Sequence, residues 1–255
     1  MGLLEMKRVQ IMVLLLLIPF CLGLTKEFDR VLVRAKRGDP EAQSNIGLMY
    51  EYGEGVTQDY QQAIYWYQKA AQQGNAQAES LLGFMYYKGK SVPLDYEQAA
   101  YWYRRAADHG FAEAQLNLGN MYATGQGVKQ DEREAMRWYR KAAEQGDVQA
   151  QSQMGFAYWT GRGVQRDPEE SARWYRLAAD QGWAQAQAIL GILHMIGKGV
   201  PRNKVAAYMW TTLAVRNGFG KASSARDKIA KQLTPVQVEE AQRQANVWIE
   251  SRSNR

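Results

Sequence analysis

The feature that most constrains the fold of this 255-residue chain is a repeat with a period of 36 residues. Three series of residues recur at that interval: Gly47, Gly83, Gly119, Gly155 and Gly191; Trp66, Trp102, Trp138, Trp174 and Trp210; and Gly74, Gly110, Gly146, Gly182 and Gly218. A fixed period of this length is typical of repeat proteins, in which each unit buries its apolar face against the next one. We therefore expect one structural unit present in five copies.

Each unit is predicted to be a pair of helices. In the first unit, apolar residues recur at helical spacing from Ala42 to Tyr50 and again from Tyr60 to about Gln73. The intervening Gly53–Val56 supplies glycines, which tolerate the positive φ needed where a helix stops and turns. Asp59 is suited to cap the second helix, because its carboxylate can accept an unpaired backbone N–H.

Gly47 lies inside the first predicted helix, where glycine costs about 1 kcal/mol relative to alanine. We expect the large side chain of Trp66 or Tyr67 to lie against the helix backbone there and to offset that cost. The five repeats are predicted to span residues 42–218. Residues 24–41 then form a linker and a half-repeat that caps the first unit, and residues 219–255 form a C-terminal cap with helices at about 221–232 and 235–250.

The repeat pattern resembles a known family. Ala-x-x-x-x-Gly-x-x-Tyr, then Gly-x-Gly-Val, then Ala-x-x-Trp-Tyr-x-x-Ala-Ala and a closing glycine are similar to the Sel1-like repeat, a relative of the tetratricopeptide repeat. The resemblance implies an all-α, right-handed superhelical solenoid that acts as a protein-interaction scaffold without chemistry of its own. Four local departures are Ser91, Ser171, His194 and Thr211.

The N-terminal segment has the layout of a secretory signal peptide over residues 1–23. Lys7 and Arg8 precede an apolar run from Ile11 to Ile18, and Gly23 offers a small residue near a cleavage point. The run is short for a membrane span of about 20 residues, although an uncleaved N-terminal anchor is the alternative. We expect a periplasmic or secreted bacterial protein.

Charge and composition argue against several functions. The net charge is +6, with Lys and Arg interspersed among Glu and Asp, so we expect a solvated surface and no nucleic-acid partner. The two histidines, His109 and His194, match no metal-binding pattern, so no metal or cofactor is expected. His109 suits a helix C-terminus, and His194 stands where other repeats have tyrosine, in a packing role. We predict that the chain is not an enzyme.

Partner-binding residues are expected at repeat positions whose side chains differ from one repeat to the next. By analogy with tetratricopeptide arrays, the first helix of each pair lines a concave groove, and the positions one and four after the mid-helix glycine face it. The first of these columns holds Leu48, Phe84, Asn120, Phe156 and Ile192, and the second holds Glu51, Tyr87, Ala123, Trp159 and Met195. Large rigid side chains at such positions would anchor a protein or peptide partner.

Alternatives stay open at this stage. Filling gaps between adjacent repeats is the equal alternative for Phe84, Phe156 and Trp159, and the sequence does not separate the two roles. Exposed aromatic residues would also suit carbohydrate or peptidoglycan binding. Cysteine-rich relatives bind or slowly hydrolyse β-lactams, but this chain has a single cysteine, Cys21, and no S-x-x-K arrangement, so that activity is the weakest candidate.

Overall fold

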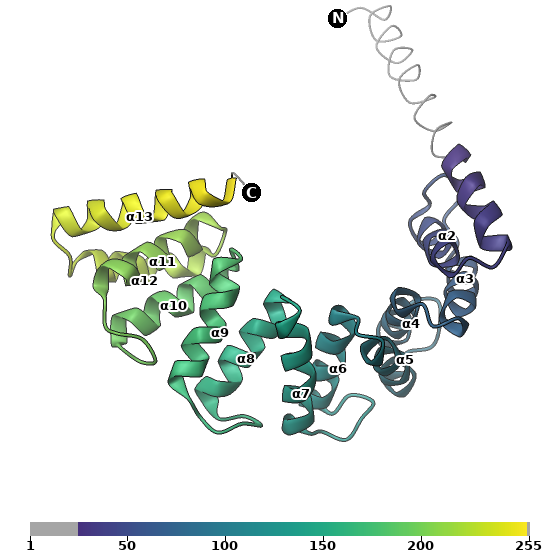
Figure 1. The fold of residues 1–255 in the computed structure, drawn as a ribbon, viewed down its shortest axis with the longest axis horizontal. Helices are drawn as coiled ribbons and strands as arrows, with labels where there is room; N and C mark the ends of the chain where they lie inside the picture. The colour runs from purple at the N-terminus through teal and green to yellow at the C-terminus, as the bar shows by residue number, and fades with distance from the viewer. Residues whose placement is uncertain (1–24, 254–255) are drawn as a thin grey trace, which may run out of the picture. The chain divides into compact units, whose positions relative to one another are not determined.

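The structure, a computed structural model, describes residues 25–253, in which the regular secondary structure is entirely helical (Figure 1). The predicted leader over residues 1–23 lies outside the described part. A helical segment over residues 25–36 comes first. The five pairs follow: α2 (Pro40–Tyr52) with α3 (Tyr60–Gln72), α4 (Ala76–Lys88) with α5 (Tyr96–Asp108), α6 (Ala112–Thr124) with α7 (Glu132–Glu144), α8 (Val148–Thr160) with α9 (Pro168–Asp180), and α10 (Ala184–Ile196) with α11 (Lys204–Arg216). The expected all-α fold of five helix pairs is confirmed.

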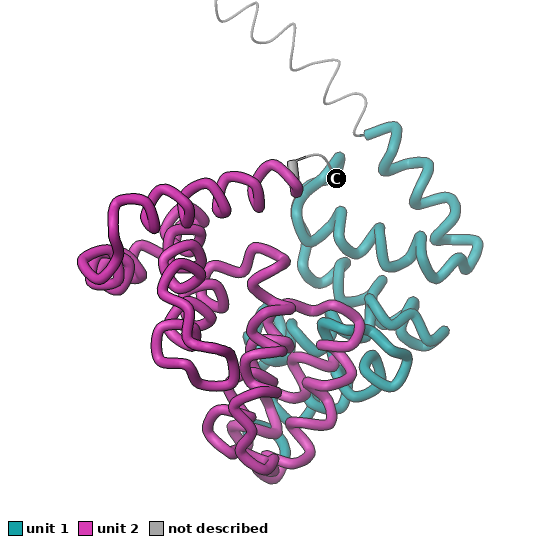
Figure 2. Tube along the Cα trace, turned by 60° about the vertical axis from the view of Figure 1, so that its left-hand side comes forward, with its two compact units in different colours: residues 1–114, 126–128 teal, residues 115–125, 129–255 magenta. Residues whose placement is uncertain are grey.

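The chain divides into two compact units (Figure 2). The first extends to residue 114 and includes residues 126–128, and the second comprises residues 115–125 and the chain from 129 onward. Within the first unit α2 packs on α3, α3 on α4 and α4 on α5. Within the second, each of α7 to α11 packs on its successor, and α11 also contacts the C-terminal helices. Each unit thus buries its core between helices that follow one another in sequence.

The turns follow the predicted chemistry. First helices end on glycines in the left-handed region, as at Gly53 with φ 74° and Gly197 with φ 67°. Second helices begin after an acidic or amide cap whose side chain accepts backbone N–H groups: Asp59, Asp95, Asp131, Asp167 and Asn203. Ser91 replaces the second turn glycine and keeps its left-handed backbone, with φ 61°. These caps and turns fix where each helix starts and stops.

The mid-helix glycines make room for tyrosine rings. A Cβ added at Gly119 would lie 2.7 Å from Cδ1 of Tyr139, which is closer than packed carbon atoms approach. The tyrosine after each tryptophan, rather than the tryptophan, is therefore the residue that needs the glycine. Tyr175 plays this part in the fourth repeat, and burial raises its pKa to about 12. In the fifth repeat Thr211 takes the place of the tyrosine.

Within the units, buried amides join a repeat to the helix that precedes it. The Gln151 amide donates to the carbonyl of Ala143, 3.2 Å away, and its oxygen accepts from Gln181 at 2.9 Å. Gln43 repeats this pattern with the carbonyl of Ala35 at 3.1 Å. The segment over residues 25–36 therefore supplies the acceptor that a second helix supplies elsewhere, as a half-repeat would.

The second repeat carries a charged version of the same junction. Glu79 stands at the glutamine position and is fully buried. Its Oε2 lies 2.9 Å from Nδ1 of His109, and its Oε1 lies 2.8 Å from a guanidinium nitrogen of Arg105. Arg105 also donates to the carbonyl of Ala71, so it takes over the bond that the glutamine amide makes in other repeats. His109 thus contacts the buried carboxylate of this junction and also forms the C-cap of α5.

The C-terminal cap consists of a short 3-10 turn (Gly220–Ala222), α12 (Ser223–Ala230) and α13 (Pro235–Ser253). Thr234 and Gln237 exchange side-chain to backbone hydrogen bonds and start α13 as a capping box. Trp248 of α13 packs edge-on against Trp210 of α11, with 6.1 Å between ring centroids. Among the described residues, no helix has the length and apolar character needed to cross a membrane.

Candidate partner-binding pockets

The column one residue after the mid-helix glycine is largely accessible. Phe84, Phe156 and Ile192 are 38%, 42% and 45% exposed, high values for large apolar side chains. Leu48 and Asn120 are partly buried, and Asn120 accepts a hydrogen bond from the hydroxyl of Tyr139 at 2.8 Å. Three of the five positions therefore present apolar surface within their own units.

The column four residues after the glycine packs more closely. Trp159 and Met195 are partly buried, each against a core cluster of the second unit, and Ala123 packs similarly. Tyr87 is also partly buried, and its hydroxyl donates to Oε1 of Gln126 in the next repeat's turn at 3.2 Å. This column thus contributes to packing along the chain.

Glu51 of the second column is engaged within the fold, although it also lines the pocket beside Phe84 described below. This carboxylate is 2% exposed, accepts a hydrogen bond from the Tyr67 hydroxyl at 2.8 Å, and lies 3.0 Å from Nζ of Lys90. The cause is local: the Tyr67 ring fills the space beside Gly47, which brings its hydroxyl to the next turn of α2. Glu51 therefore satisfies a buried tyrosine.

A pocket of about 200 Å³ opens beside Phe84 in the first unit. Its lining includes Gln77, Ser80, Phe84, Phe111 and Glu113. Nζ of Lys88 lies 5.9 Å from the centre of the Phe84 ring. The pocket thus combines two aromatic rings with amide, hydroxyl and charged groups, which suits an apolar side chain held beside polar backbone.

A pocket of about 420 Å³ opens beside Phe156 in the second unit. Its lining includes Gln149, Ser152, Phe156 and Trp183. The guanidinium carbon of Arg162 lies 5.5 Å from the centre of the Phe156 ring. Aromatic, amide, hydroxyl and cationic groups meet here in the same combination as at Phe84.

The two pockets occupy equivalent places two repeats apart. Gln77, Ser80 and Phe84 correspond to Gln149, Ser152 and Phe156 at an interval of 72 residues, and Phe111 corresponds to Trp183. The intervening repeat has Asn120 and Asp147 where these repeats have aromatic residues. The sequence therefore encodes an apolar pocket in alternate repeats.

The second aromatic residue of each pocket replaces a helix cap. Asp39, Asn75 and Asp147 accept backbone N–H groups at the starts of α2, α4 and α8. Trp183 has the same extended backbone, with φ −66° and ψ 106°, but its side chain makes no capping hydrogen bond. A lost cap costs about 1 kcal/mol. Phe111 and Trp183 therefore stand where the fold alone favours Asp or Asn.

Sequence reasoning missed Phe111 and Trp183, although a signal was present. The position after the closing glycine reads Asp39, Asn75, Phe111, Asp147, Trp183 and Phe219 along the chain. A change from capping residues to aromatic residues at one repeat position cannot be explained by helix capping. Phe219 is the exception among the aromatic members, because it packs beneath the C-terminal cap with Ala188 and Ala222.

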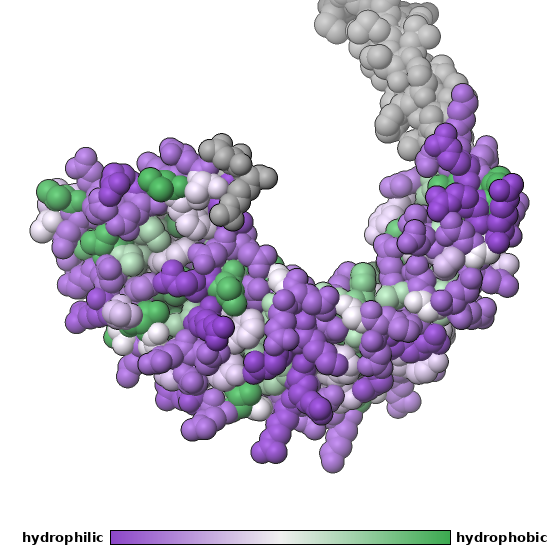
Figure 3. Space-filling view, in the orientation of Figure 1, coloured by the Kyte–Doolittle hydropathy of each residue, from purple (hydrophilic) through white to green (hydrophobic). Residues whose placement is uncertain are grey.

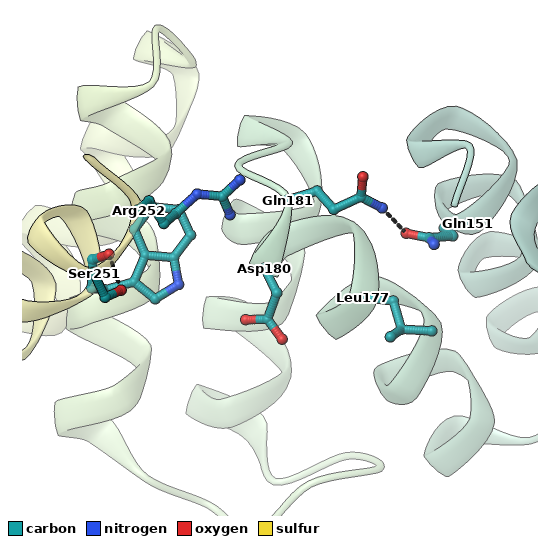
Figure 4. A pocket seen from close by; sticks show the side chains of 7 residues that line it. Gln151, Leu177, Asp180, Gln181, Ser251 and Arg252 are labelled. Atoms are coloured by element: carbon teal, nitrogen blue, oxygen red, sulfur yellow. Dashed lines mark hydrogen bonds between the residues drawn. The ribbon is translucent and has the colours of Figure 1, made fainter. Parts of the chain in front are cut away.

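A third pocket, of about 540 Å³, lies between α8, α9 and α13 (Figure 4). Arg252 lies over the Trp248 ring, 4.7 Å from its centre. The Gln181 amide points at Gln151, so both amides are already paired. Burial raises the pKa of Asp180, while Arg176, a hydrogen bond from Trp248 and Arg252 counteract part of that rise. No nucleophile and base are paired in this lining.

His194 is a packing residue, as expected. It is 8% exposed, its Nε2 lies 3.1 Å from a guanidinium nitrogen of Arg176, and its Nδ1 lies 3.3 Å from the Pro201 carbonyl oxygen. Burial lowers its pKa, the carbonyl opposes that shift, and Arg176 adds to it. Within residues 25–253, no group of three or more His, Cys, Asp or Glu side chains is placed to hold a metal ion.

Five consecutive helix pairs with shared turns, caps and junction amides define a tandem α-helical repeat protein. Comparison with models of known protein families identifies its family. The Sel1 repeat model matches residues 40–75, 76–111, 112–147, 148–183 and 184–219. The chain belongs to the Sel1 repeat family, and that membership indicates a protein-interaction scaffold. Comparison with curated protein sequences gave no match.

Solved structures of Sel1 repeat proteins resemble this one. A Sel1 repeat protein from Oxalobacter formigenes is 30% identical, with 89% of this chain and 90% of that chain covered and a TM-score of 0.75. The antigen c5321, described as a protective antigen of uropathogenic Escherichia coli, is 32% identical over 86% of this chain and 56% of its own, with a TM-score of 0.57. A Sel1 repeat protein from Klebsiella pneumoniae is 25% identical over 80% and 99%, with a TM-score of 0.50.

Proposed function

We propose that this chain is a non-catalytic scaffold, exported to the bacterial envelope, that binds a protein or peptide through the exposed face of its first helices. The anchors are the pockets beside Phe84 and Phe156, each acting within its own unit. Family membership supports the scaffold role in general terms. The choice of surface rests on this chain's own residues.

The observation that carries the proposal is the recurrence of an aromatic pocket in alternate repeats at the expense of helix capping. Selection for stability alone would keep Asp or Asn at positions 111 and 183, because each cap stabilises by about 1 kcal/mol. Local departures from what the fold favours are typical of functional sites. Exposed aromatic residues in small pockets are also the side chains that contribute most binding energy at protein interfaces.

The pocket chemistry favours a peptide as the ligand. Gln77 and Gln149 are exposed and present amides that can both donate to and accept from a peptide backbone. Phe84 and Phe156 offer apolar faces to a side chain of that peptide. Ile192 shares the exposed column, whereas Tyr87, Trp159 and Met195 act mainly in packing between repeats.

Selection from a random dodecapeptide library tests the proposal. We expect the immobilised chain to enrich peptides with aromatic or large aliphatic residues, and the variant Phe84→Ser/Phe156→Ser to lose them. The matched control is Tyr65→Ser/Tyr101→Ser, which removes two aromatic residues of similar exposure, 48% and 51%, from second helices. Both variants should keep their helical circular dichroism, because the altered residues are exposed.

Two outcomes would overturn the assignment. Equal loss of peptides in the control variant would show that exposed aromatic residues bind without regard to the pockets. Sedimentation with purified peptidoglycan that depends on Phe84 and Phe156, without peptide enrichment, would identify the pockets as carbohydrate sites.

Export is proposed from the N-terminal segment, in which Lys7 and Arg8 precede the apolar run Ile11–Ile18. Alkaline phosphatase, which folds only outside the reducing cytoplasm, reports this directly when fused after residue 41. We expect an active fusion, and we expect activity to be lost when Leu14 and Leu16 are changed to Asp. An inactive fusion with the unaltered leader would refute export.

A further inference from the structure

The positive charge of this chain is concentrated near its C-terminus. Residues 198–231 contain eight Lys and Arg and one acidic residue, Asp227, whereas residues 25–183 contain nineteen Lys and Arg against twenty-one Asp and Glu. The expectation that basic and acidic residues are interspersed therefore holds for the first part of the chain and fails here. A strongly basic segment of 34 residues needs its own explanation.

Several of these cations adjoin, in sequence, the members of one apolar cluster. Met195 of α10, Val205 of α11, and Ile229 and Ala230 of α12 belong to this cluster. Lys204 precedes Val205, Lys228 precedes Ile229, and Lys231 follows Ala230; Arg202 and Lys198 belong to the turn between α10 and α11. Arg202 folds back against Gly197, since a Cβ added there would lie 3.1 Å from the Cβ of Arg202.

Most of this charge is uncompensated within residues 25–253. Lys198, Arg202, Lys228 and Lys231 are exposed, and none has a carboxylate within 4.0 Å. The single acidic residue of the segment, Asp227, is held by Arg226 at 2.8 Å. Within the described part of the chain, Glu239, on α13 next to Val238 of the cluster, is the one exposed carboxylate that adjoins the cluster in the same way, against three lysines. The balance stays positive and would favour an anionic partner.

Two exposed aliphatic side chains accompany the cations. Ile196 is 49% exposed and follows Met195 of the cluster. Val236 is 73% exposed and lies two residues before Val238, which packs against the same cluster. In Figure 3, the part of the surface that carries α10 to α13 in Figure 1 shows apolar residues among hydrophilic ones. Basic residues next to exposed aliphatic residues are the combination found in proteins that bind at a membrane interface.

We propose that the basic cap surface, formed by Lys198, Arg202, Lys204, Lys228 and Lys231 with Ile196 and Val236, binds the anionic headgroups of a membrane surface. Four of the five cations are lysines, whose compact charges suit a non-specific attraction to anionic headgroups, whereas arginine is the usual choice for bidentate phosphate recognition. None of the seven residues is aromatic, so the surface lacks the stacking groups that single-stranded nucleic acids use. This surface is separate from the pockets at Phe84 and Phe156, and its proposal does not depend on them.

Sedimentation with lipid vesicles tests the proposal. The full chain is mixed with vesicles of phosphatidylcholine alone or with 30% phosphatidylglycerol, at low and at physiological salt. Each Lys or Arg near an anionic surface contributes about a fivefold gain in binding. We expect binding that requires phosphatidylglycerol, weakens with salt, and falls at least about tenfold in the variant Lys198→Gln/Arg202→Gln/Lys228→Gln/Lys231→Gln.

The matched control is Lys36→Gln/Arg37→Gln/Lys129→Gln/Arg133→Gln, which removes four exposed cations elsewhere and leaves the N-terminal segment unchanged. An equal loss in this control, or binding that does not depend on phosphatidylglycerol, overturns the proposal. Tighter binding to a 20-base-pair DNA duplex than to the anionic vesicles, lost in the same cap variant, would identify the surface as a nucleic-acid site instead. If the quadruple variant loses helical circular dichroism, Lys198→Gln/Arg202→Gln, confined to the turn, is measured in its place.

Discussion

Replacing Phe111 by Asn separates a binding role from a packing role for the pocket residues. The Phe111 N–H donates to the Ala106 carbonyl, as Asn75 does to Ala70, so the backbone at position 111 matches that of a capped repeat. Phe111→Asn should therefore supply the missing cap of α6 while it removes one wall of the pocket beside Phe84. Because Asn is neutral, the exposed Glu113 in the same pocket lining meets no new charge.

The two contributions to stability nearly cancel. Phe111 is partly buried, and full burial of a phenylalanine contributes about 1.5–3 kcal/mol, so its removal should cost the lower end of that range. The new cap should return about 1 kcal/mol. We expect the free energy of unfolding of Phe111→Asn to stay within about 1 kcal/mol of the parent, while peptide binding at the Phe84 pocket is lost.

Urea unfolding followed by circular dichroism measures the first quantity, and peptide titration measures the second. Leu118→Asn is the packing control: Leu118 is fully buried, so a polar group there should cost more than about 3 kcal/mol. A loss above roughly 2 kcal/mol for Phe111→Asn would place this residue with Leu118 and refute the reasoning.

Three further predictions concern the repeat framework. Gly119→Ala should destabilise by about 1–3 kcal/mol in urea unfolding, because its Cβ would collide with the Tyr139 ring; a neutral result would mean that the ring can move. Gly199→Ala should lower stability at least twice as much as Gly146→Ala. Both glycines have positive φ, but of the two only a Cβ at Gly199 would meet a backbone carbonyl, that of Pro168. Equal shifts of the melting temperature would contradict this. Burial lowers the pKa of His194, so the unfolded chain binds this proton more tightly: stability should be full above roughly pH 6.5 and fall as the pH drops toward the folded pKa. His194→Tyr, the residue of other repeats, should remove that loss in melts between pH 7.5 and 5, and an unchanged pH dependence would assign the loss to other groups.

The repeat period explains why the fold was predictable from the sequence. Turn glycines, caps such as Asp59 and the closing glycines each have one local role, and the same role recurs five times, so coincidence is excluded. The partner of the mid-helix glycine was less defined, because Trp66 and Tyr67 are adjacent and both recur. Their positions on the helix differ by about 100°, and the direction of Tyr67 toward Gly47 emerges only from the packing.

The site was harder to predict, because it depends on contacts between residues far apart in the sequence. Phe84 and Phe156 were found from variation within one column, but Phe111 and Trp183 come at the far end of the same repeats, where the next helix pair begins. The burial of Glu51 was not predictable from its column, because it depends on Tyr67 and on Lys90, which comes from the turn of the next repeat. Comparing equivalent positions of the repeats gives no information on such contacts between helices.

Site-specific photo-crosslinking in intact cells tests the central claim most directly. Benzoylphenylalanine replaces Phe84 or Phe156 with little change in shape, and replaces Tyr65 or Tyr101 on second helices as controls of similar exposure. The pocket hypothesis predicts that irradiation joins the chain to the same discrete envelope protein from positions 84 and 156, and not from positions 65 and 101. Crosslinks from positions 65 and 101 alone, or from all four alike, would contradict it.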